Sequence, residues 1–336
     1  MKTLAIKFKY LGDVVLLIPA LRALRQADPD GELHVLVATE AVPLLEPLGL
    51  VDKVWGLSRK NRKTSDTWKL VKQLRHAQFD RSIDFVGNDR GAWLSWAVRA
   101  RERIGLTPPL GFFGRQRAYH HFMPDPGGNL HQIDRDLRLV EFLGIDTSQA
   151  GEPELRPDPA LAEAASKLVP TNAAVLHLST SQPKKEWPIL YWSRVADLLE
   201  ERQVPAIFSA GPTDREQQLI ADLLEHRPYS RRMPKLDSLS MFLAAIARAR
   251  LMMACDTGPL HMAAALGVPT ISFFGPTPRW QWRPRGSQHL AVAGSPCTCS
   301  PHARRCTSDP WCMTAIRPDR VVEELLALLM TQYSQR

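Results

Sequence analysis

Short apolar runs alternate with longer amphipathic segments along the whole chain. The runs are rich in Val, Ile and Phe, and the segments between them have the length and apolar spacing of helices. Such runs are typical of buried strands, and their alternation with helices indicates parallel sheets with crossover connections. The pattern therefore predicts an α/β protein.

Each half of the chain predicts its own series of strands and helices. In the first half we expect strands over residues 3–8, 32–38, 51–57, 80–85 and 103–106, and helices over residues 13–27, 41–48, 67–77 and 90–99. In the second half we expect strands over residues 173–178, 205–210, 251–255 and 270–274, and helices over residues 188–202, 214–225, 240–249 and 259–266. The two series predict two Rossmann-like domains that face each other across a cleft.

A Pro-rich stretch separates the two series. It begins at Gly151 and reads GEPELRPDPALAEAASKLVPTN, which is typical of an interdomain connection followed by a short helix. The chain of 336 residues is long enough for two domains of about 150 residues each. We expect a first domain over residues 1–155 and a second over residues 156–318. The amphipathic segment over residues 319–336 is expected to pack back on the first domain.

Composition and charge limit the class of protein and its partners. Hydrophobic content of 44% and charged content of 23% are ordinary for a folded protein. No apolar run reaches the roughly 18 residues of a membrane span, and the chain opens with a strand-like run, so we expect a cytoplasmic protein. The net charge of +8 favours anionic partners such as nucleotides, nucleic acids or anionic membranes. A nucleic-acid recognition motif is absent from the sequence.

Four of the five cysteines gather near the C-terminal end. These are Cys297, Cys299, Cys306 and Cys312, with His302 among them. Their spacing is not the paired C-x2-C arrangement of zinc ribbons and fingers. An odd total of cysteines in a reducing compartment argues against a disulfide framework. The sequence therefore leaves two alternatives for these cysteines, a structural zinc site and free thiols.

The clearest candidate site is the break at the end of the apolar run over residues 251–255. There the run stops at Asp256-Thr257-Gly258-Pro259, and a helical segment follows with His261 in its first turn. A helix N-terminus binds anions through free N–H groups, and Gly258 allows close approach. This predicts a pyrophosphate site. The alternative is that Asp256 and Thr257 only cap the helix and that His261 fills the core. The motif is not GxGxxG, which argues against a nicotinamide dehydrogenase.

The stretch around this break resembles a known family. DTGPLHMAAALGVPTISFFGPTPRW is similar to the signature of glycosyltransferase family 9, the ADP-heptose:lipopolysaccharide heptosyltransferases. LAIKFKYLGDVVLLIPALRALRQ, KKEWPILYWSRVADLL and CMTAIRPDRVVEELLALL resemble three further family segments in the family's order. The resemblance implies a GT-B fold and an inverting glycosyl transfer that needs no cofactor and no metal ion.

The resemblance also implies two catalytic residues. Asp13 follows Gly12 in a strand-to-helix turn and matches the family's proposed catalytic base, whereas an isolated acid there is more often a helix cap or first-turn acid. Lys185 matches the lysine that neutralises the departing diphosphate, although a lone loop lysine is usually only solvated. Lys184 could share the task of Lys185.

The remaining implied contacts concern the two substrates. Donor contacts are expected from Thr180, Ser181, Lys184, Glu216, Asp256, Thr257, Gly258, Pro259 and His261. Asp214 is the alternative to Glu216 at the ribose, and Leu236 is expected beside the adenine. Pro259 and Glu186 depart from the residues that are usual in the family. The net charge around the diphosphate is therefore not predicted by the resemblance. Acceptor contacts are expected from Gly12, Arg59, Lys60, Arg62, Lys63, Arg115, Arg117 and His120, although a charge run is usually only a solvated loop.

Together these features predict a heptosyltransferase. We expect transfer of heptose from ADP-heptose to the lipopolysaccharide inner core by a monomer that is peripheral to the inner face of the cytoplasmic membrane. The alternatives are a family 9 transferase with another nucleotide sugar or acceptor, and a nucleotide-binding protein without catalysis. Retention of Asp13 favours the enzyme. The motifs do not identify the sugar or the core position.

Overall fold

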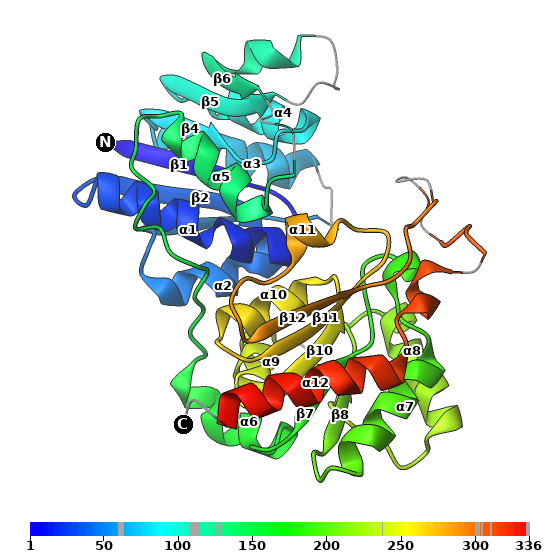
Figure 1. The fold of residues 1–336 in the computed structure, drawn as a ribbon. Helices are drawn as coiled ribbons and strands as arrows, with labels where there is room; N and C mark the ends of the chain where they lie inside the picture. The colour runs from blue at the N-terminus through cyan, green and yellow to red at the C-terminus, as the bar shows by residue number, and fades with distance from the viewer. Residues whose placement is uncertain are drawn as a thin grey trace. The chain divides into compact units, whose positions relative to one another are not determined.

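The chain folds into two compact units, Met1–Arg156 and Pro157–Arg336 (Figure 1). The computed structural model describes residues 1–59, 64–107, 114–124, 127, 129–236, 238–299, 303, 305–309 and 311–333. The boundary between the two units follows Arg156, whereas the sequence predicts it after residue 155. Both positions lie inside the Pro-rich connection. Each unit is an α/β layer structure, which confirms the predicted fold class.

The first unit contains a six-stranded parallel sheet in the order β3-β2-β1-β4-β5-β6. Its strands are β1 (Lys2–Lys7), β2 (Glu32–Ala38), β3 (Lys53–Leu57), β4 (Arg81–Asp84), β5 (Glu102–Thr107) and β6 (His121–Pro124). This is the strand order of a doubly wound sheet, whose ligands bind at the carboxyl ends of the strands.

Helices cover both faces of this sheet (Figure 1). They are α1 (Leu11–Ala27), α2 (Val42–Leu45), α3 (Thr64–His76), α4 (Asp89–Val98) and α5 (Gln132–Glu141). Helix α1 packs against α5, and α3 packs against α4. Leu4 and Ile6 of β1 form a core with Leu74 of α3 and Leu94 of α4. Burial of these apolar faces is the main force that holds the layers together.

The second unit repeats the topology with the order β12-β11-β10-β7-β8-β9. Its strands, again all parallel, are β7 (Ala174–His177), β8 (Ala206–Ser209), β9 (Arg231–Arg232), β10 (Leu251–Cys255), β11 (Thr270–Phe274) and β12 (His289–Ala293). Its helices are α6 (Ala162–Leu168), α7 (Ile189–Glu200), α8 (Asp214–His226), α9 (Leu239–Ile246), α10 (Gly258–Ala265), α11 (Arg279–Trp282) and α12 (Pro318–Tyr333).

Three aromatic side chains form the centre of the second core. The ring centroid of Trp187 lies 4.4 Å from that of Phe273 and 5.1 Å from that of Trp192. All three side chains are almost completely buried. Trp187 therefore packs the start of α7 onto the sheet, two residues after Lys185 in the chain. Among the helices of the described residues, none combines the length and apolarity that crossing a membrane requires.

Five of the described strands and α-helices were not anticipated from the hydrophobic pattern, one of them the four-residue helix α11. Strands β6, β9 and β12 are short and exposed in part, so alternation is weak in them. Helix α5 follows a Gly- and Pro-containing stretch and carries only a narrow apolar face, with Ile133, Leu139 and Val140 buried.

The expected packing of the C-terminal segment is corrected by the structure. Val321, Val322 and Leu325 of α12 are buried in the core of the second unit, and α12 packs along α7. The sequence instead predicts that residues 319–336 pack back on the first domain. The apolar face of these first turns matches α7, so the second unit extends through α12 (Figure 1).

Two buried acidic groups stabilise the sheet edge of the first unit. The Lys7 ammonium donates to both carboxylate oxygens of Asp136 at 2.8 and 2.6 Å, and both side chains are completely buried. Asp84, at the end of β4, accepts hydrogen bonds from the Tyr119 hydroxyl at 2.6 Å and from the Val86 backbone N–H at 2.8 Å. Buried carboxylates need such partners because desolvation penalises their charge.

Asp84 should make the stability of the first unit depend on pH. Burial raises its pKa to about 6, although the hydrogen bond from Tyr119 acts in the opposite direction. The folded state therefore binds this proton more tightly than the unfolded chain does, so the stabilisation is complete below about pH 4 and is lost as pH rises through about 6. We expect the unfolding free energy of the wild type to fall by roughly 2–3 kcal/mol across this window relative to Asp84→Asn.

Urea unfolding of the full chain, followed by tryptophan fluorescence between pH 4 and pH 7.5, measures this difference. Asp66→Asn is the control, because Asp66 is an exposed acid of the same unit and should keep the wild-type profile. Parallel pH profiles for Asp84→Asn and the wild type would contradict the assignment.

Candidate active site

The candidate residues of the second unit gather at the carboxyl ends of its strands. Lys185 follows β7, Asp256 follows β10, and Thr277 follows β11. These strands are neighbours and parallel, so their ends lie at one edge of the sheet. This is the edge at which open α/β sheets bind ligands.

A buried ion pair joins two of the predicted residues. The Lys185 ammonium lies 2.6 Å from the Asp256 carboxylate, and the His261 ring lies 3.9 Å from the other oxygen of that carboxylate. Burial alone would raise the pKa of Asp256, but the nearby His261 ring and the Lys185 charge outweigh burial and hold that pKa well below its ordinary value. Asp256 is therefore an anion that holds Lys185 at the start of α10.

The N-terminus of α10 is not closed by its own side chains. Thr257 is the N-cap residue, but its hydroxyl makes no capping hydrogen bond. Gly258 and Pro259 form the first turn and are only partly buried. The simple alternative, in which the Thr257 hydroxyl caps the helix, is therefore not what the structure shows. A helix end of this kind keeps its N–H groups and its positive dipole for an anion.

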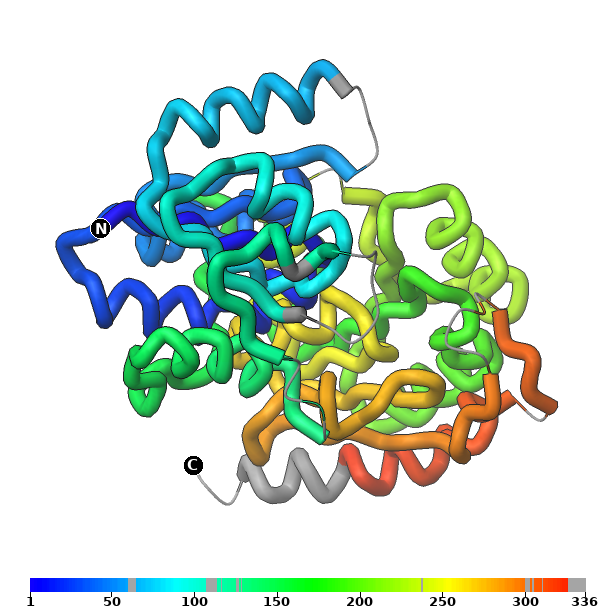
Figure 2. The backbone as a smooth tube through the Cα atoms, turned by 90° about the horizontal axis from the view of Figure 1, so that it is seen from above, coloured from blue at the N-terminus to red at the C-terminus, as the bar shows by residue number. Residues whose placement is uncertain are grey.

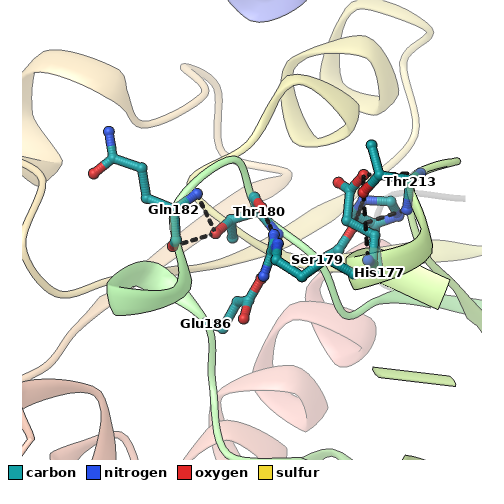
Figure 3. Close-up of polar contacts among 9 residues, drawn as sticks. His177, Ser179, Thr180, Gln182, Glu186 and Thr213 are labelled. Atoms are coloured by element: carbon teal, nitrogen blue, oxygen red, sulfur yellow. Dashed lines mark hydrogen bonds and ion pairs between the residues drawn. The ribbon is translucent and has the colours of Figure 1, made fainter. Parts of the chain in front are cut away.

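The loop after β7 is organised by Glu186 (Figure 3). Its carboxylate accepts a hydrogen bond from the Thr180 backbone N–H at 3.1 Å and pairs with the Arg215 guanidinium at 2.8 Å. Arg215 also donates to the Thr180 carbonyl. Glu186 departs from the family's usual residue, and the structure shows that Arg215 compensates its charge. The positive charge of Lys185 is thus not cancelled by its neighbour in the chain.

A chain of small polar groups joins the ends of β7 and β8. His177 contacts the Ser209 hydroxyl at 3.0 Å and the Ser179 hydroxyl at 3.3 Å, and Ser179 accepts from the Gly211 backbone N–H at 2.8 Å (Figure 3). Burial lowers the pKa of His177 to about 4, so the ring is neutral near pH 7. This network fixes the path of the loop that leads to Thr180.

The other residues predicted to bind the nucleotide sugar differ in their exposure and in their hydrogen bonds. The Thr180 hydroxyl donates to the Gln182 carbonyl at 2.6 Å, Ser181 is exposed, and Lys184 is buried. Glu216 forms a capping box with Thr213, which occupies one of its carboxylate oxygens.

The two acids that the sequence offers for a ribose thus differ in their surroundings. Asp214 is exposed in the first turn of α8, whereas the Glu216 carboxylate lies over Gly211. A methyl group on Gly211 would stand 2.3 Å from a Glu216 oxygen, so a side chain there would displace the Glu216 carboxylate. Leu236 lies in the loop before α9, among the described residues.

The segment over residues 311–316 is attached to the loop that carries Lys185. The Trp311 indole N–H donates to the Lys184 carbonyl at 3.1 Å, and the Trp187 indole N–H donates to the Ile316 carbonyl at 3.0 Å. On the other side, the sulfur of Met313 fills the space where a side chain on Gly275 would lie. The segment therefore supports two loops of the site at once.

The cysteines of the second unit are free thiols. The sulfur atoms of Cys299 and Cys306 lie 3.6 Å apart, and Cys312 is buried beside Met313. Across the described ranges, which omit residues 300–302, no set of three or more His, Cys, Asp or Glu side chains is arranged to hold a metal ion. His302 lies outside the described residues.

In the first unit, Asp13 occupies the third position of α1. The N-cap residue is Tyr10, so Asp13 is not the helix cap. Its Oδ1 is buried and has no hydrogen-bond partner in the described part of the chain, and the Lys9 ammonium lies 3.8 Å away. A buried carboxylate oxygen without a donor is unfavourable unless a ligand supplies one.

The predicted acceptor residues are spread over several elements. The Arg59 guanidinium stacks 4.0 Å over the Tyr10 ring, close in sequence to Asp13, whereas Arg115 is buried and pairs with Asp89 at 2.5 Å. Arg117 and His120 are exposed near β6. Lys60, Arg62 and Lys63 lie outside the described residues.

Buried polar atoms without partners are concentrated at the carboxyl ends of strands. In the described part of the chain these are Asp13 Oδ1, Trp192 Nε1, His261 Nδ1 and Thr277 Oγ1. Trp192 belongs to the core of α7, but the other three follow β1, β10 and β11 at the edge where ligands bind. Sequence reasoning did not assign Thr277 a role, although it belongs to the family motif.

Comparison with known proteins agrees with this arrangement. The model of glycosyltransferase family 9 (heptosyltransferase) matches residues 67–311. The chain is 29% identical over 382 residues to lipopolysaccharide heptosyltransferase 1 of Pseudomonas aeruginosa, covering all of both chains. It is 25% identical over 291 residues to lipopolysaccharide heptosyltransferase 3 of Escherichia coli, covering 82% of this chain and 84% of that protein.

The fold has solved counterparts. The structure of E. coli heptosyltransferase WaaC with ADP-2-deoxy-2-fluoro heptose matches with a TM-score of 0.73 and 20% identity, covering 97% of this chain and 99% of that one. Two doubly wound units, together with the match to this structure, show the GT-B fold. The chain belongs to glycosyltransferase family 9, the heptosyltransferase family.

The pair of Lys185 and Asp256 can be tested by its effect on stability. Asp256→Ala should lower the unfolding free energy by about 3 kcal/mol, because it leaves a largely buried ammonium group without its carboxylate. Lys185→Met combined with Asp256→Ala should restore part of this loss, since no unpaired charge is left. Urea unfolding of both variants measures the difference, with Glu225→Ala, an exposed acid, as the control. Equal losses in the single and double variants would contradict the pairing.

Proposed function

We propose that this protein transfers heptose from ADP-heptose to the inner core of lipopolysaccharide with inversion at the anomeric carbon. The observation that carries the proposal is that, within the described residues, buried polar atoms of Asp13, His261 and Thr277 at the ligand-binding sheet edges have no hydrogen-bond partner. His261 lies in the first turn of α10, and Thr277 follows the neighbouring strand β11. The names of the relatives, which are lipopolysaccharide heptosyltransferases, support the donor and acceptor.

The second unit would bind the ADP part of the donor. The open N-terminus of α10, with Thr257 and Gly258, supplies N–H groups and a positive dipole to the diphosphate. Lys185 adds a full positive charge, and the Thr277 hydroxyl and the His261 ring each have a free polar atom to offer. The structure of E. coli WaaC with ADP-2-deoxy-2-fluoro heptose supports an ADP-sugar as the donor.

Lys185 and the helix end would also assist departure of the diphosphate. Negative charge grows on the leaving phosphate oxygens as the glycosidic bond breaks, and fixed positive groups stabilise that charge. Lys185 is held by Asp256 at 2.6 Å. Because Asp256 follows β10 directly before α10, this pair places the ammonium group beside the start of α10. These groups would do what a divalent ion does in other transferases.

Asp13 would act as the base that activates the acceptor hydroxyl. Its buried Oδ1 lacks a donor, and a hydroxyl group of the acceptor would supply one. Transfer of that proton to the carboxylate makes the oxygen a stronger nucleophile at the anomeric carbon. Arg59 lies near the start of α1 through its stacking on Tyr10, and we propose that it binds an anionic group of the acceptor.

The lipid acceptor determines the proposed location of the protein in the cell. Lipopolysaccharide precursors are membrane lipids, so we propose a peripheral protein at the cytoplasmic face of the inner membrane, active as a monomer. The net charge of +8 suits an anionic surface. Which residue of the core is extended is left to assays with defined acceptors.

Replacing Asp13 tests the proposed base. Asp13→Asn keeps the shape of the side chain but cannot accept the proton, so we expect kcat to fall by about 10²–10⁴-fold with ADP affinity unchanged. Release of ADP in the presence of a lipopolysaccharide precursor measures turnover, and calorimetry measures affinity. Asp30→Asn, an exposed acid of the same unit, is the control. Wild-type turnover in Asp13→Asn would remove this residue from the base role.

The identity of the donor can be tested by thermal shifts. ADP and ADP-heptose should raise the Tm of the protein more than UDP, GDP or their sugars at equal concentrations. Lys185→Met should weaken ADP binding about tenfold or more, because a charge-assisted contact to phosphate is lost. A larger shift with UDP or GDP would favour the alternative family 9 transferase that uses another nucleotide sugar.

A further inference from the structure

Three tryptophans lie together on two neighbouring helices of the first unit. Trp68 of α3 and Trp96 of α4 are 53% and 51% exposed. Between them, Trp93 of α4 contacts the Trp68 ring edge-on at a centroid distance of 6.0 Å and packs with its other side on the core. We name the surface formed by Trp68, Trp93 and Trp96, with Lys69 and Lys72, the tryptophan face.

The two helices are held side by side, so this surface is continuous. The Arg75 guanidinium of α3 donates to the Ala97 carbonyl of α4 at 2.6 Å, at the opposite end from the contact of Trp68 with Trp93. Figure 2 shows α3 on the outside of the first unit. Single exposed apolar side chains are common, but neighbouring exposed tryptophans mark an interaction surface.

The charges around the tryptophans are mostly positive. The exposed side chains of the two helices include Lys69, Lys72, His76 and Arg99. Asp66 is an exposed acid in the first turn of α3, and Asp89 in the first turn of α4 pairs with Arg115. Tryptophan beside lysine is typical of segments at a membrane–water interface, since the indole ring enters the headgroup region and the ammonium group meets anionic lipid.

We propose that the tryptophan face docks the protein on an anionic phospholipid bilayer. This inference rests on the proposed function, which requires an acceptor that is anchored in a membrane. Lipid fits better than a protein partner because protein interfaces are depleted in lysine, which frames this surface. Trp68 lies in the first turns of α3, and helices of a parallel sheet begin at the carboxyl ends of the strands. Docking would therefore bring the membrane to the edge that holds Asp13.

Binding of the full-length protein to vesicles tests the proposal. We expect the wild type to co-sediment with vesicles of phosphatidylglycerol and phosphatidylethanolamine and to bind pure phosphatidylcholine weakly. Trp68→Ala with Trp96→Ala should reduce binding to the anionic vesicles at least tenfold. Tyr229→Ala and Trp280→Ala are matched controls, because these aromatic residues of the second unit are 98% and 41% exposed. Both controls should bind as the wild type does.

A second variant keeps the test independent of tryptophan packing. Lys69→Glu with Lys72→Glu alters two exposed side chains and should weaken binding to anionic vesicles by about fivefold or more for each lysine. Added salt should weaken wild-type binding in the same direction. Wild-type vesicle binding in both double variants would overturn the proposal. So would a wild-type dimer that becomes monomeric in Trp68→Ala with Trp96→Ala, because the face would then bind a second copy of the chain.

Transfer assays separate this proposal from the proposed function. With a delipidated, water-soluble core acceptor, the tryptophan double variant should retain wild-type turnover and the wild-type Tm shift with ADP. With acceptor in vesicles its turnover should fall in step with binding. Loss of transfer to every acceptor in the wild type would refute the proposed function while vesicle binding still stood. Equal turnover of wild type and double variant on vesicle-bound acceptor would refute the docking surface alone.

Discussion

The site in the second unit depends on the ion pair between Lys185 and Asp256. A carboxylate at the buried end of β10 must be compensated, and the nearest cation comes from the loop after the neighbouring strand β7. The pair therefore determines where the loop runs and places an ammonium group beside the start of α10. Glu186, the next residue, points to Arg215 instead and leaves the lysine charge intact. One electrostatic requirement thus shapes the region that we assign to the diphosphate.

The two units have the same sheet topology but carry different side chains at the carboxyl ends of their strands. Both sheets have the doubly wound order, so both offer a single edge where loops converge. In the second unit this edge carries a helix N-terminus, a lysine and a histidine, which suit an anion. In the first unit it carries Asp13, whose Oδ1 accepts no hydrogen bond from the residues that the structure describes. The chemistry differs because a phosphate needs fixed positive groups, whereas an alcohol needs an acceptor for its proton.

Local pattern was enough to predict most of the fold, but not the contacts that build the site. The long periodic helices and the buried central strands were predicted because their apolar spacing is strong. The short edge strands β6 and β12 and the narrow helix α5 lack that signal. Asp256 and Lys185 were each found from the family motif. Their pairing, however, depends on β7 and β10 being neighbouring strands, and a short stretch of sequence does not show which strands are neighbours. The partnership of Glu186 with Arg215 and the unpartnered hydroxyl of Thr277 likewise arise only from tertiary structure.

The attachment of the segment over residues 311–316 has a consequence for the order of assembly. Trp311 and Trp187 join this late segment to the loop around Lys184 by two indole hydrogen bonds, and Met313 packs under Gly275. During synthesis the chain emerges from its N-terminus, and domains form as units as they leave the ribosome. The first unit can therefore close early, whereas the loop with Lys185 gains its last supports only after residues 311–316 have been translated. A nascent chain would thus complete its first sheet before the site of the second unit is fully supported.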